Sequence, residues 1–366
     1  MLETKCAGFI GLGLIGGSIA KAIHKFHPDW KLIAYDADTN NTTQALNEGV
    51  IQGVASDVDA SFSICDIIFL CAPVSYNAAY LPVLKGIMKE GALLTDVGSV
   101  KTEMHEAVKA AGLQHCFIGG HPMAGSEKTG YVYSSDRLIE NAYYILTPSE
   151  EVDLFAVANY SELVTSLGAL PMIITYEEHD YITAAISHLP HVIASSLVNL
   201  IQQIDNEDQH MKAIAAGGFK DITRIASSSP IMWQQICSAN AKNISKVLDS
   251  YILSLIQFRV DIDSQNTDKL YHLFDEAREY RNSLPISNSG PLKRIHEIYV
   301  DLADEAGGIA AIATLLATNG INIKNIGIIN NREFQDGVLH IEFYDEQSST
   351  KSAALLRARN YVVTER

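Results

Sequence analysis

The stretch GFIGLGLIGGSIAKAI, residues 8–23, constrains the fold more than any other part of the chain. Gly11, Gly13 and Gly16 have GxGxxG spacing, directly after an apolar strand and directly before a helix that contains alanine and isoleucine. In this context the first glycine permits a sharp turn, the second lets a pyrophosphate approach the backbone, and the third allows close packing of helix on strand. Because GxGxxG alone is a weak signal, a glycine-rich turn that binds nothing is the alternative.

Asp36 favours dinucleotide binding, because it follows the next expected strand in the sequence YDAD. A carboxylate at this position accepts hydrogen bonds from the adenosine ribose hydroxyls and repels a ribose phosphate, which favours NAD over NADP. The residues expected to contact NAD are Gly11, Gly13, Leu14, Ile15, Gly16, Asp36, Ala72, Pro73 and Ser99.

The alternation of apolar runs and helical segments predicts the fold class. From residue 7 to about 150, runs of strand length are separated by segments of helical period, which indicates a parallel sheet covered on both faces. We expect residues 1–170 to form a doubly wound, Rossmann-type α/β domain. Residues 171–285 are expected to form an all-α substrate and dimerisation domain, because long apolar helices of this kind commonly pack against a second copy in a homodimer.

The last part of the chain has a different pattern. The stretch PISNSGPLK contains two prolines, one glycine and three small polar residues, which predicts a linker at 286–293. Residues 294–366 then read as strand, helix, strand, strand, helix, strand, with a turn at NNREFQDG. That order predicts a small ferredoxin-like α+β domain.

Composition excludes several classes of protein. The net charge of −16 repels nucleic acid and anionic membranes. We expect a cytoplasmic protein, because no apolar run reaches the roughly 18 residues that span a bilayer and Met1–Cys6 is too short for a signal peptide. The five cysteines lack CxxC spacing, so buried reduced thiols are expected, with disulfides or a zinc site as alternatives.

Three polar stretches stand where a purely structural segment would not need polarity. They are TDVGSVK, with Ser99 and Lys101; GGHPMAGSEKTG, with His121, Ser126, Glu127 and Lys128; and GGFKDITRIASSSPIMW, with Lys220, Asp221, Arg224 and Trp233. The first two follow expected strands, and ligands of open α/β sheets bind at the carboxyl ends of the strands. Lys101 and Lys128 are alternatively solvated charges. Trp233 is most simply a core residue, with a site-lining role as the alternative.

His121 is the candidate general base. It follows two glycines and precedes Pro122, and an imidazole can take a proton from a hydroxyl while hydride leaves the same carbon. A histidine that merely caps a turn is the alternative. Arg224 offers a planar fork for a carboxylate, or else forms an ion pair with Asp221 three residues earlier.

His188 and His191 lie on either side of Pro190, which is expected to kink their helix. At this spacing both rings can share a face, so a metal pair, a substrate-facing role and core histidines are all open. We predict no metal site, because no third ligand is identifiable.

The motifs GLGLIGGS, DVGSVK, GGHPMAGSEKTG, SHLPH and GGFKDITRIASSSPIMW, in this order, closely resemble the prephenate dehydrogenase family of tyrosine biosynthesis. The resemblance covers residues 6 to about 285 and implies oxidative decarboxylation of prephenate with NAD, giving 4-hydroxyphenylpyruvate, carbon dioxide and NADH. It implies that His121 accepts the proton of the 4-hydroxyl, that Ser99 orients this hydroxyl, and that Arg224 binds a carboxylate. The other expected pocket residues are His188, His191, Ser126, Glu127 and Lys220.

The tail from about residue 294 resembles an ACT domain, a regulatory module that often senses amino acids. This looser match implies inhibition by tyrosine through a site between two copies. The residues expected to form it are Asp304, Gly307, Gly308, Ile309 and Asn322.

Three rival functions stay open on sequence grounds. An arogenate or cyclohexadienyl dehydrogenase would differ only in contacts to a keto or amino group. Another NAD-dependent hydroxy-acid dehydrogenase would share the glycine cluster without needing the other motifs, and a non-catalytic NAD and amino-acid sensor would not need His121 and Ser99.

Overall fold

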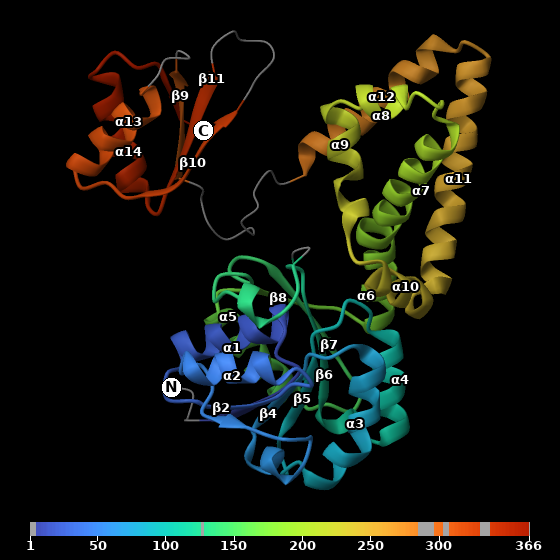
Figure 1. Ribbon diagram of the computed structural model, residues 1–366, viewed down its shortest axis with the longest axis vertical. Coiled ribbons are helices and arrows are strands. Elements are labelled where there is room, and N and C mark those ends of the chain that lie inside the picture. The colour runs from blue at the N-terminus through green and yellow to red at the C-terminus, as the bar shows by residue number, and fades with distance from the viewer. Residues whose placement is uncertain (1–4, 126–127, 285–295, 303–306, 330–336, 366) are drawn as a thin grey trace. The chain divides into compact units, whose positions relative to one another are not determined.

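The computed structural model describes residues 5–125, 128–284, 296–302, 307–329 and 337–365. The chain divides into two compact units, Met1–Ile286 and Ser287–Arg366, drawn in Figure 1. The predicted linker at 286–293 lies outside the described residues.

The first unit is built on an eight-stranded sheet in the order β3-β2-β1-β4-β5-β6-β7-β8. Its strands are β1 (Cys6–Ile10), β2 (Lys31–Tyr35), β3 (Gly53–Val54), β4 (Ile67–Leu70), β5 (Leu93–Asp96), β6 (Phe117–Pro122), β7 (Tyr143–Pro148) and β8 (Leu170–Ile173). From β3 to β6 all neighbours are parallel, which is the doubly wound order that the glycine motif predicts.

The expectation of a wholly parallel sheet is wrong at one strand, because β7 runs antiparallel to β6. A parallel neighbour needs a crossover, whereas the described part of the connection between these strands contains a single short 3₁₀ turn, Tyr131–Tyr133. The chain therefore returns directly beside β6. This places His121 opposite Ile145 in the register of the two strands.

Helices cover both faces of the sheet, as predicted. They are α1 (Leu14–Phe26), α2 (Thr39–Asn47), α3 (Val74–Ile87), α4 (Thr102–Ala111) and α5 (Leu154–Ser166). Successive strand residues alternate between the faces: Phe9 belongs to the core under α1 and α5, and Ile10 to the core under α3 and α4.

The second part of this unit is helical. Its helices are α6 (Tyr176–Thr183), α7 (Leu189–Ile204), α8 (His210–Ile214), α9 (Gly217–Thr223), α10 (Pro230–Ala239), α11 (Ala241–Asp263) and α12 (Thr267–Ser283). A π-helical turn, Ala184–His188, joins α6 to α7 and lies just before Pro190, whose missing N–H interrupts the helical hydrogen bonds at this point. The distortion expected at Pro190 thus takes the form of a π-turn just before it.

The apolar stripe of α11 is only partly covered within one chain. Ile244 and Val247 are buried, whereas Ile252 and Leu255 are 45% and 48% exposed. The continuous helical segment Tyr176–Ile204 is also long and apolar enough to cross a membrane by length and composition alone. One such helix is weak evidence of a membrane span, and this one contains buried polar side chains that hydrogen-bond within the protein.

The second unit has the predicted βαββαβ order. Its elements are β9 (His296–Leu302), α13 (Gly308–Thr318), β10 (Ile323–Ile329), β11 (Gly337–Phe343), α14 (Glu346–Arg357) and β12 (Val363–Glu365). The strands form an antiparallel sheet in the order β10-β11-β9-β12, with a core that includes Ile298, Val300 and Leu339. The predicted turn at NNREFQDG lies outside the described residues except for its final glycine.

Candidate active site

The polar segments that the sequence singles out converge at one edge of the large sheet. Five neighbouring strands, β2, β1, β4, β5 and β6, are parallel, so their carboxyl ends lie together. The segments that leave the first four of these strands contain Asp36, the glycine turn, Ala72 and Ser99, and His121 lies at the end of β6 itself. This edge is where open α/β sheets bind ligands, at the point where the strand order reverses between β1 and β4.

The three glycines of the turn exclude side chains for different reasons. Gly11 has a φ of +93°, and a Cβ on it would lie 2.8 Å from the amide nitrogen of Ala72. A Cβ on Gly16 would lie 2.6 Å from the carbonyl oxygen of Gly11, so this glycine permits close packing of α1 on the sheet. Gly13 faces open space within 4 Å. The first turn of α1 has no side-chain cap, which leaves its amides directed at that space.

Asp36 is held by the backbone at the end of β2. Its carboxylate accepts hydrogen bonds from the amides of Leu12 (2.5 Å) and Asp38 (2.8 Å). The acid is thereby tied to the glycine turn from the neighbouring strand. These contacts place it beside the expected position of the adenosine ribose.

His121 lies at the end of β6 in a chain of hydrogen-bonded side chains. Its Nδ1 is 2.8 Å from Nε2 of His179, and Nδ1 of His179 is 2.8 Å from Oδ1 of Asp180. Burial lowers the pKa of His121 well below its usual value, and His179, Lys101 and His188 lower it further, while Asp180 acts in the opposite direction. His121 is therefore neutral at pH 7 and can accept a proton.

Lys101 is not the solvated charge that the sequence allowed. Its side chain and that of Asp96 are both fully buried and form an ion pair, and Lys101 Nζ also donates to the carbonyl oxygen of Gly120 (2.7 Å). Asp96 in turn accepts hydrogen bonds from the amides of Gly98 (2.9 Å) and Gly120 (3.2 Å). The pair thus holds the loop of Ser99 against the strand of His121.

Arg224 and His191 come together on the helical side. The imidazole of His191 stacks on Trp233 with ring centroids 3.7 Å apart. Burial lowers the pKa of His191, and the charge of Arg224 lowers it further. The indole Nε1 of Trp233 is buried without a hydrogen-bond partner in the described part of the chain. Trp233 is half-buried, so the structure leaves both its core role and its site-lining role open.

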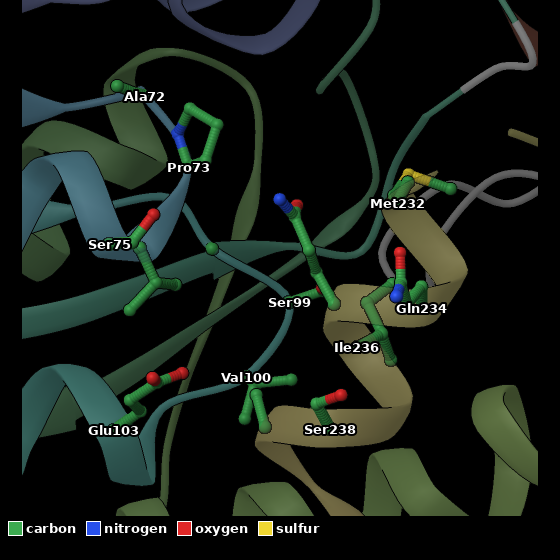
Figure 2. A pocket seen from close by; sticks show the side chains of 14 residues that line it. Ala72, Pro73, Ser75, Ser99, Val100, Glu103, Met232, Gln234, Ile236 and Ser238 are labelled. Carbon is green, nitrogen blue, oxygen red and sulfur yellow. The ribbon is translucent and has the colours of Figure 1, made fainter. Parts of the chain in front are cut away.

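A cavity of about 630 Å³ lies between the two halves of this unit. Figure 2 shows Pro73 and Ser75 on one wall, Met232 and Gln234 of α10 on the other, and Ser99 between them. Of the residues predicted from sequence, Ala72, Pro73 and Ser99 line it. Its volume falls within the range of small-molecule and cofactor sites.

The remaining predicted residues are placed as follows. His188 is 1% exposed, and its Nδ1 lies 3.2 Å from Nδ2 of Asn240. Burial lowers the pKa of His188 to about 4. Both observations favour the alternative in which His188 is a core histidine. Lys220 and Arg224 are exposed on and after α9. Ser126 and Glu127 lie outside the described residues. Within the described residues, no group of three potential metal ligands occurs.

Sequence reasoning missed His179 and Asp180. Both belong to TYEEHD, which follows the last strand of the sheet and lies within the segment expected to form the helical domain. The available signal was a pair of adjacent titratable residues at the start of an otherwise apolar helical region. Glu103, Gln234 and Gln235, which line the cavity, had no distinguishing sequence pattern.

The fold and the site together define an NAD-dependent dehydrogenase. The features that do so are the doubly wound sheet with its glycine turn, the acid after β2, the neutral histidine at the end of β6 and the helical domain that follows. Two family models match the chain: the prephenate dehydrogenase nucleotide-binding domain over residues 19–172, and the prephenate dehydrogenase dimerization domain over residues 175–276. The chain belongs to the prephenate dehydrogenase family.

Individual relatives agree with this assignment. The chain is 38% identical to prephenate dehydrogenase of Bacillus subtilis over 95% of both chains, and 31% identical to cyclohexadienyl dehydrogenase of Zymomonas mobilis over 78% of this chain and 97% of that one. Prephenate dehydrogenase of Aquifex aeolicus, solved in complex with hydroxyphenyl propionate and NAD+, has a TM-score of 0.73 and 30% identity, covering 78% of this chain and 99% of that one. Because the Bacillus match extends over 352 residues, it includes most of the C-terminal unit.

Proposed function

We propose that this protein catalyses the oxidative decarboxylation of prephenate to 4-hydroxyphenylpyruvate. The observation that supports it most directly is His121, an imidazole kept neutral by burial at the ligand-binding edge of an NAD-type sheet. A neutral histidine here suits an alcohol oxidation, because the hydroxyl must lose its proton as the carbon loses hydride.

NAD fits the residues present. The open space at Gly13 and the uncapped start of α1 suit the pyrophosphate, and Asp36 suits the ribose hydroxyls. Leu14, Ile15, Ala72, Pro73 and Ser99 complete the proposed contacts. When bound, NAD supplies the acceptor for the hydride that leaves the ring carbon bearing the 4-hydroxyl.

The chain's own residues supply binding and proton transfer. His121 takes the hydroxyl proton, Ser99 orients the hydroxyl, and Arg224, beside His191, binds a carboxylate of the substrate. The bond to the ring carboxylate then breaks as carbon dioxide leaves, and its electron pair makes the ring aromatic. The phenolate oxygen formed in this way takes the proton back from His121, which returns the base to its neutral form. Proposed contacts by Ser126, Glu127, His188 and Lys220 rest on the resemblance of their motifs to the family.

Incubation of the protein with NAD and prephenate, followed at the absorbance of NADH, tests this function. We expect NADH and 4-hydroxyphenylpyruvate in equal amounts, and none when either reactant is omitted. Arogenate belongs in the same assay, because structures and relatives similar to this chain include an arogenate dehydrogenase and a cyclohexadienyl dehydrogenase. If kcat/KM is higher for arogenate than for prephenate, arogenate is the preferred substrate. If the protein turns over neither compound, the proposal is contradicted.

A homodimer is the proposed assembly. The family model that matches residues 175–276 is a dimerization domain, and α11 exposes apolar side chains such as Leu253 (67%) and Ile256 (43%). Light scattering should give about twice the 40.0 kDa mass of one chain. The cytoplasm is the proposed location.

The C-terminal unit is proposed to be an ACT-type domain that mediates inhibition by tyrosine. Gly307, in a left-handed conformation with a φ of +94°, is the N-cap residue of α13, and Gly308 approaches Leu302 so closely that a Cβ would lie 3.0 Å from it. Ile309 and Asn322 are exposed, and Asp304 lies outside the described residues. Asn322 precedes β10 and lies level with the start of β9, at the opposite end of the sheet from Gly307, so within one chain it does not adjoin the other residues of the proposed site. Calorimetry of the full-length protein with tyrosine tests the proposal, and the absence of binding would contradict it.

A further inference from the structure

His179 and Asp180 form a buried hydrogen-bonded chain behind His121. The atoms in contact are Nδ1 of His121 with Nε2 of His179, and Nδ1 of His179 with Oδ1 of Asp180, both at 2.8 Å. The His121 and His179 rings have centroids 5.0 Å apart and planes at 68°. His179 is 1% exposed and Asp180 is fully buried, so water does not compete for these contacts.

Asp180, the last member of this row of hydrogen-bonded side chains, is ionised. Burial would raise the pKa of Asp180, but hydrogen bonds from the His179 ring and from Thr102 and the Lys101 amide together hold it below the usual value. The two amides begin α4 and lie 2.8 Å from Oδ1 and Oδ2 respectively. Asp180 therefore also supplies the N-terminal cap that α4 does not provide for itself.

An ionised Asp180 fixes the protons along the chain. A carboxylate only accepts, so Nδ1 of His179 carries a proton and donates it. In the tautomer with its proton on Nδ1, His179 presents Nε2 as an acceptor, so Nδ1 of His121 is the donor of their hydrogen bond. The remaining nitrogen of a neutral His121, Nε2, is left with a lone pair, which is the form that a general base requires.

We propose that His179 and Asp180 are positioning residues, which hold His121 in the tautomer with an unprotonated Nε2 and stabilise its charge when it takes a proton. This inference rests on the proposed function, because the proton concerned is that of the substrate hydroxyl. The proton transfer breaks the hydroxyl O–H bond and forms an Nε2–H bond on His121. The resulting cation keeps its Nδ1–H donated to His179, and Asp180 lies behind it as the compensating anion.

A purely structural role is the competing explanation, since Asp180 caps α4 and His179 fills buried space. Thr183 offers a matched control on the same helix. It is 2% exposed, and its hydroxyl donates to the carbonyl oxygens of His179 (2.9 Å) and Asp180 (3.3 Å) without touching the chain of imidazoles. Thr183→Val therefore disturbs α6 but leaves the proton order intact.

The first test is kinetic. In His179→Phe we expect kcat to fall by about 10²-fold while KM for prephenate stays within about threefold, because a base with the wrong tautomer binds substrate but does not take its proton. Asp180→Asn should also lower kcat, and Thr183→Val should stay within about threefold of the wild type. A His179→Phe protein that folds and keeps its kcat, or a Thr183→Val protein that loses as much, would overturn the inference.

The second test uses the unmodified protein and no substrate. In ¹⁵N-edited NMR spectra of histidine-labelled protein, His121, assigned by the signal lost in His121→Asn, should show a protonated Nδ1 and an unprotonated Nε2. The opposite tautomer would overturn the proposed chain even if the enzyme turns over prephenate. Conversely, the expected tautomer in a protein that does not oxidise prephenate would contradict the proposed function and leave the hydrogen-bonded chain standing.

Discussion

The carboxyl edge of the sheet and the helical segment around Arg224 hold their charged residues in opposite ways. Asp96, Lys101 and Asp180 are fully buried, and each is paired or hydrogen-bonded to backbone amides or carbonyls. Lys220 and Arg224 are exposed at the surface of short helices. Buried charges are costly unless satisfied, so they fix one geometry, whereas exposed charges can attract and release an anion. In the proposed function, proton transfer takes place at the buried edge and substrate capture at the exposed helices.

The largest expected effect comes from breaking the buried pair. Lys101→Met leaves Asp96 buried without its cation and should lower the free energy of unfolding by about 3–5 kcal/mol. Chemical denaturation measures this. Lys89→Met is the control, because Lys89 forms a surface ion pair with Asp66 (2.8 Å), and such pairs contribute about 0–1 kcal/mol. If the two substitutions lower the free energy of unfolding by equal amounts, the buried ion pair is no more important to stability than the exposed one.

His121→Asn should lower kcat by ~10² or more and leave substrate binding within about tenfold, because the amide cannot accept the proton as imidazole does. Steady-state kinetics with prephenate and NAD measure both quantities. His105→Asn is a matched control, since His105 is a buried histidine of the same domain, hydrogen-bonded to Thr147 (2.9 Å) and stacked on Tyr176. Near-normal turnover in His121→Asn would remove His121 from its role as base.

Arg224→Ala should raise KM for prephenate by about 10-fold to 100-fold with kcat changed much less, because it removes a charge-assisted contact made by the bound substrate. Arg278→Ala provides the control, since Arg278 is an exposed arginine on α12 paired with Asp275. An unchanged KM would favour the alternative in which Arg224 serves an ion pair with Asp221.

The glycine turn allows a comparison between space for a ligand and space for packing. Gly16→Ala should destabilise the fold by about 1–3 kcal/mol, because its Cβ would meet the backbone at 2.6 Å. Gly13→Ala should leave stability nearly unchanged and weaken NAD binding by about tenfold, since its Cβ enters the open space. Thermal unfolding and NAD titration of both variants decide this, and unaltered NAD binding in Gly13→Ala would argue against the proposed pyrophosphate position.

The smallest effect concerns pH. Because burial holds the pKa of His121 well below its usual value, the base stays unprotonated as pH falls through 6.5. We expect kcat/KM to change less than about twofold from pH 7.5 to 6.5, and to fall only when pH passes through the lowered pKa. If kcat/KM instead falls with a midpoint at or above pH 6.5, the buried environment does not lower the pKa of the base.

Family resemblance and local signals predicted most of the fold. The glycine spacing, the apolar strand after Cys6 and the acid after the second strand are short-range features, and the backbone geometry at Gly11 and Gly16 follows from steric contacts over a few residues. The helical character of residues 171–285 and the βαββαβ order of the tail are local in the same sense. The direction of β7 was not predictable, because apolar runs look alike in parallel and antiparallel pairs.

The amino-acid sequence by itself determined which segments become strands and helices and which polar residues lie at strand ends, since propensity and periodicity act within one element. Only the tertiary structure decided that Lys101 is buried against Asp96, and that His179, which is 58 residues from His121 in sequence, contacts its ring. Such contacts depend on how distant elements pack, and packing sets the burial, the proton positions and therefore the chemistry of His121.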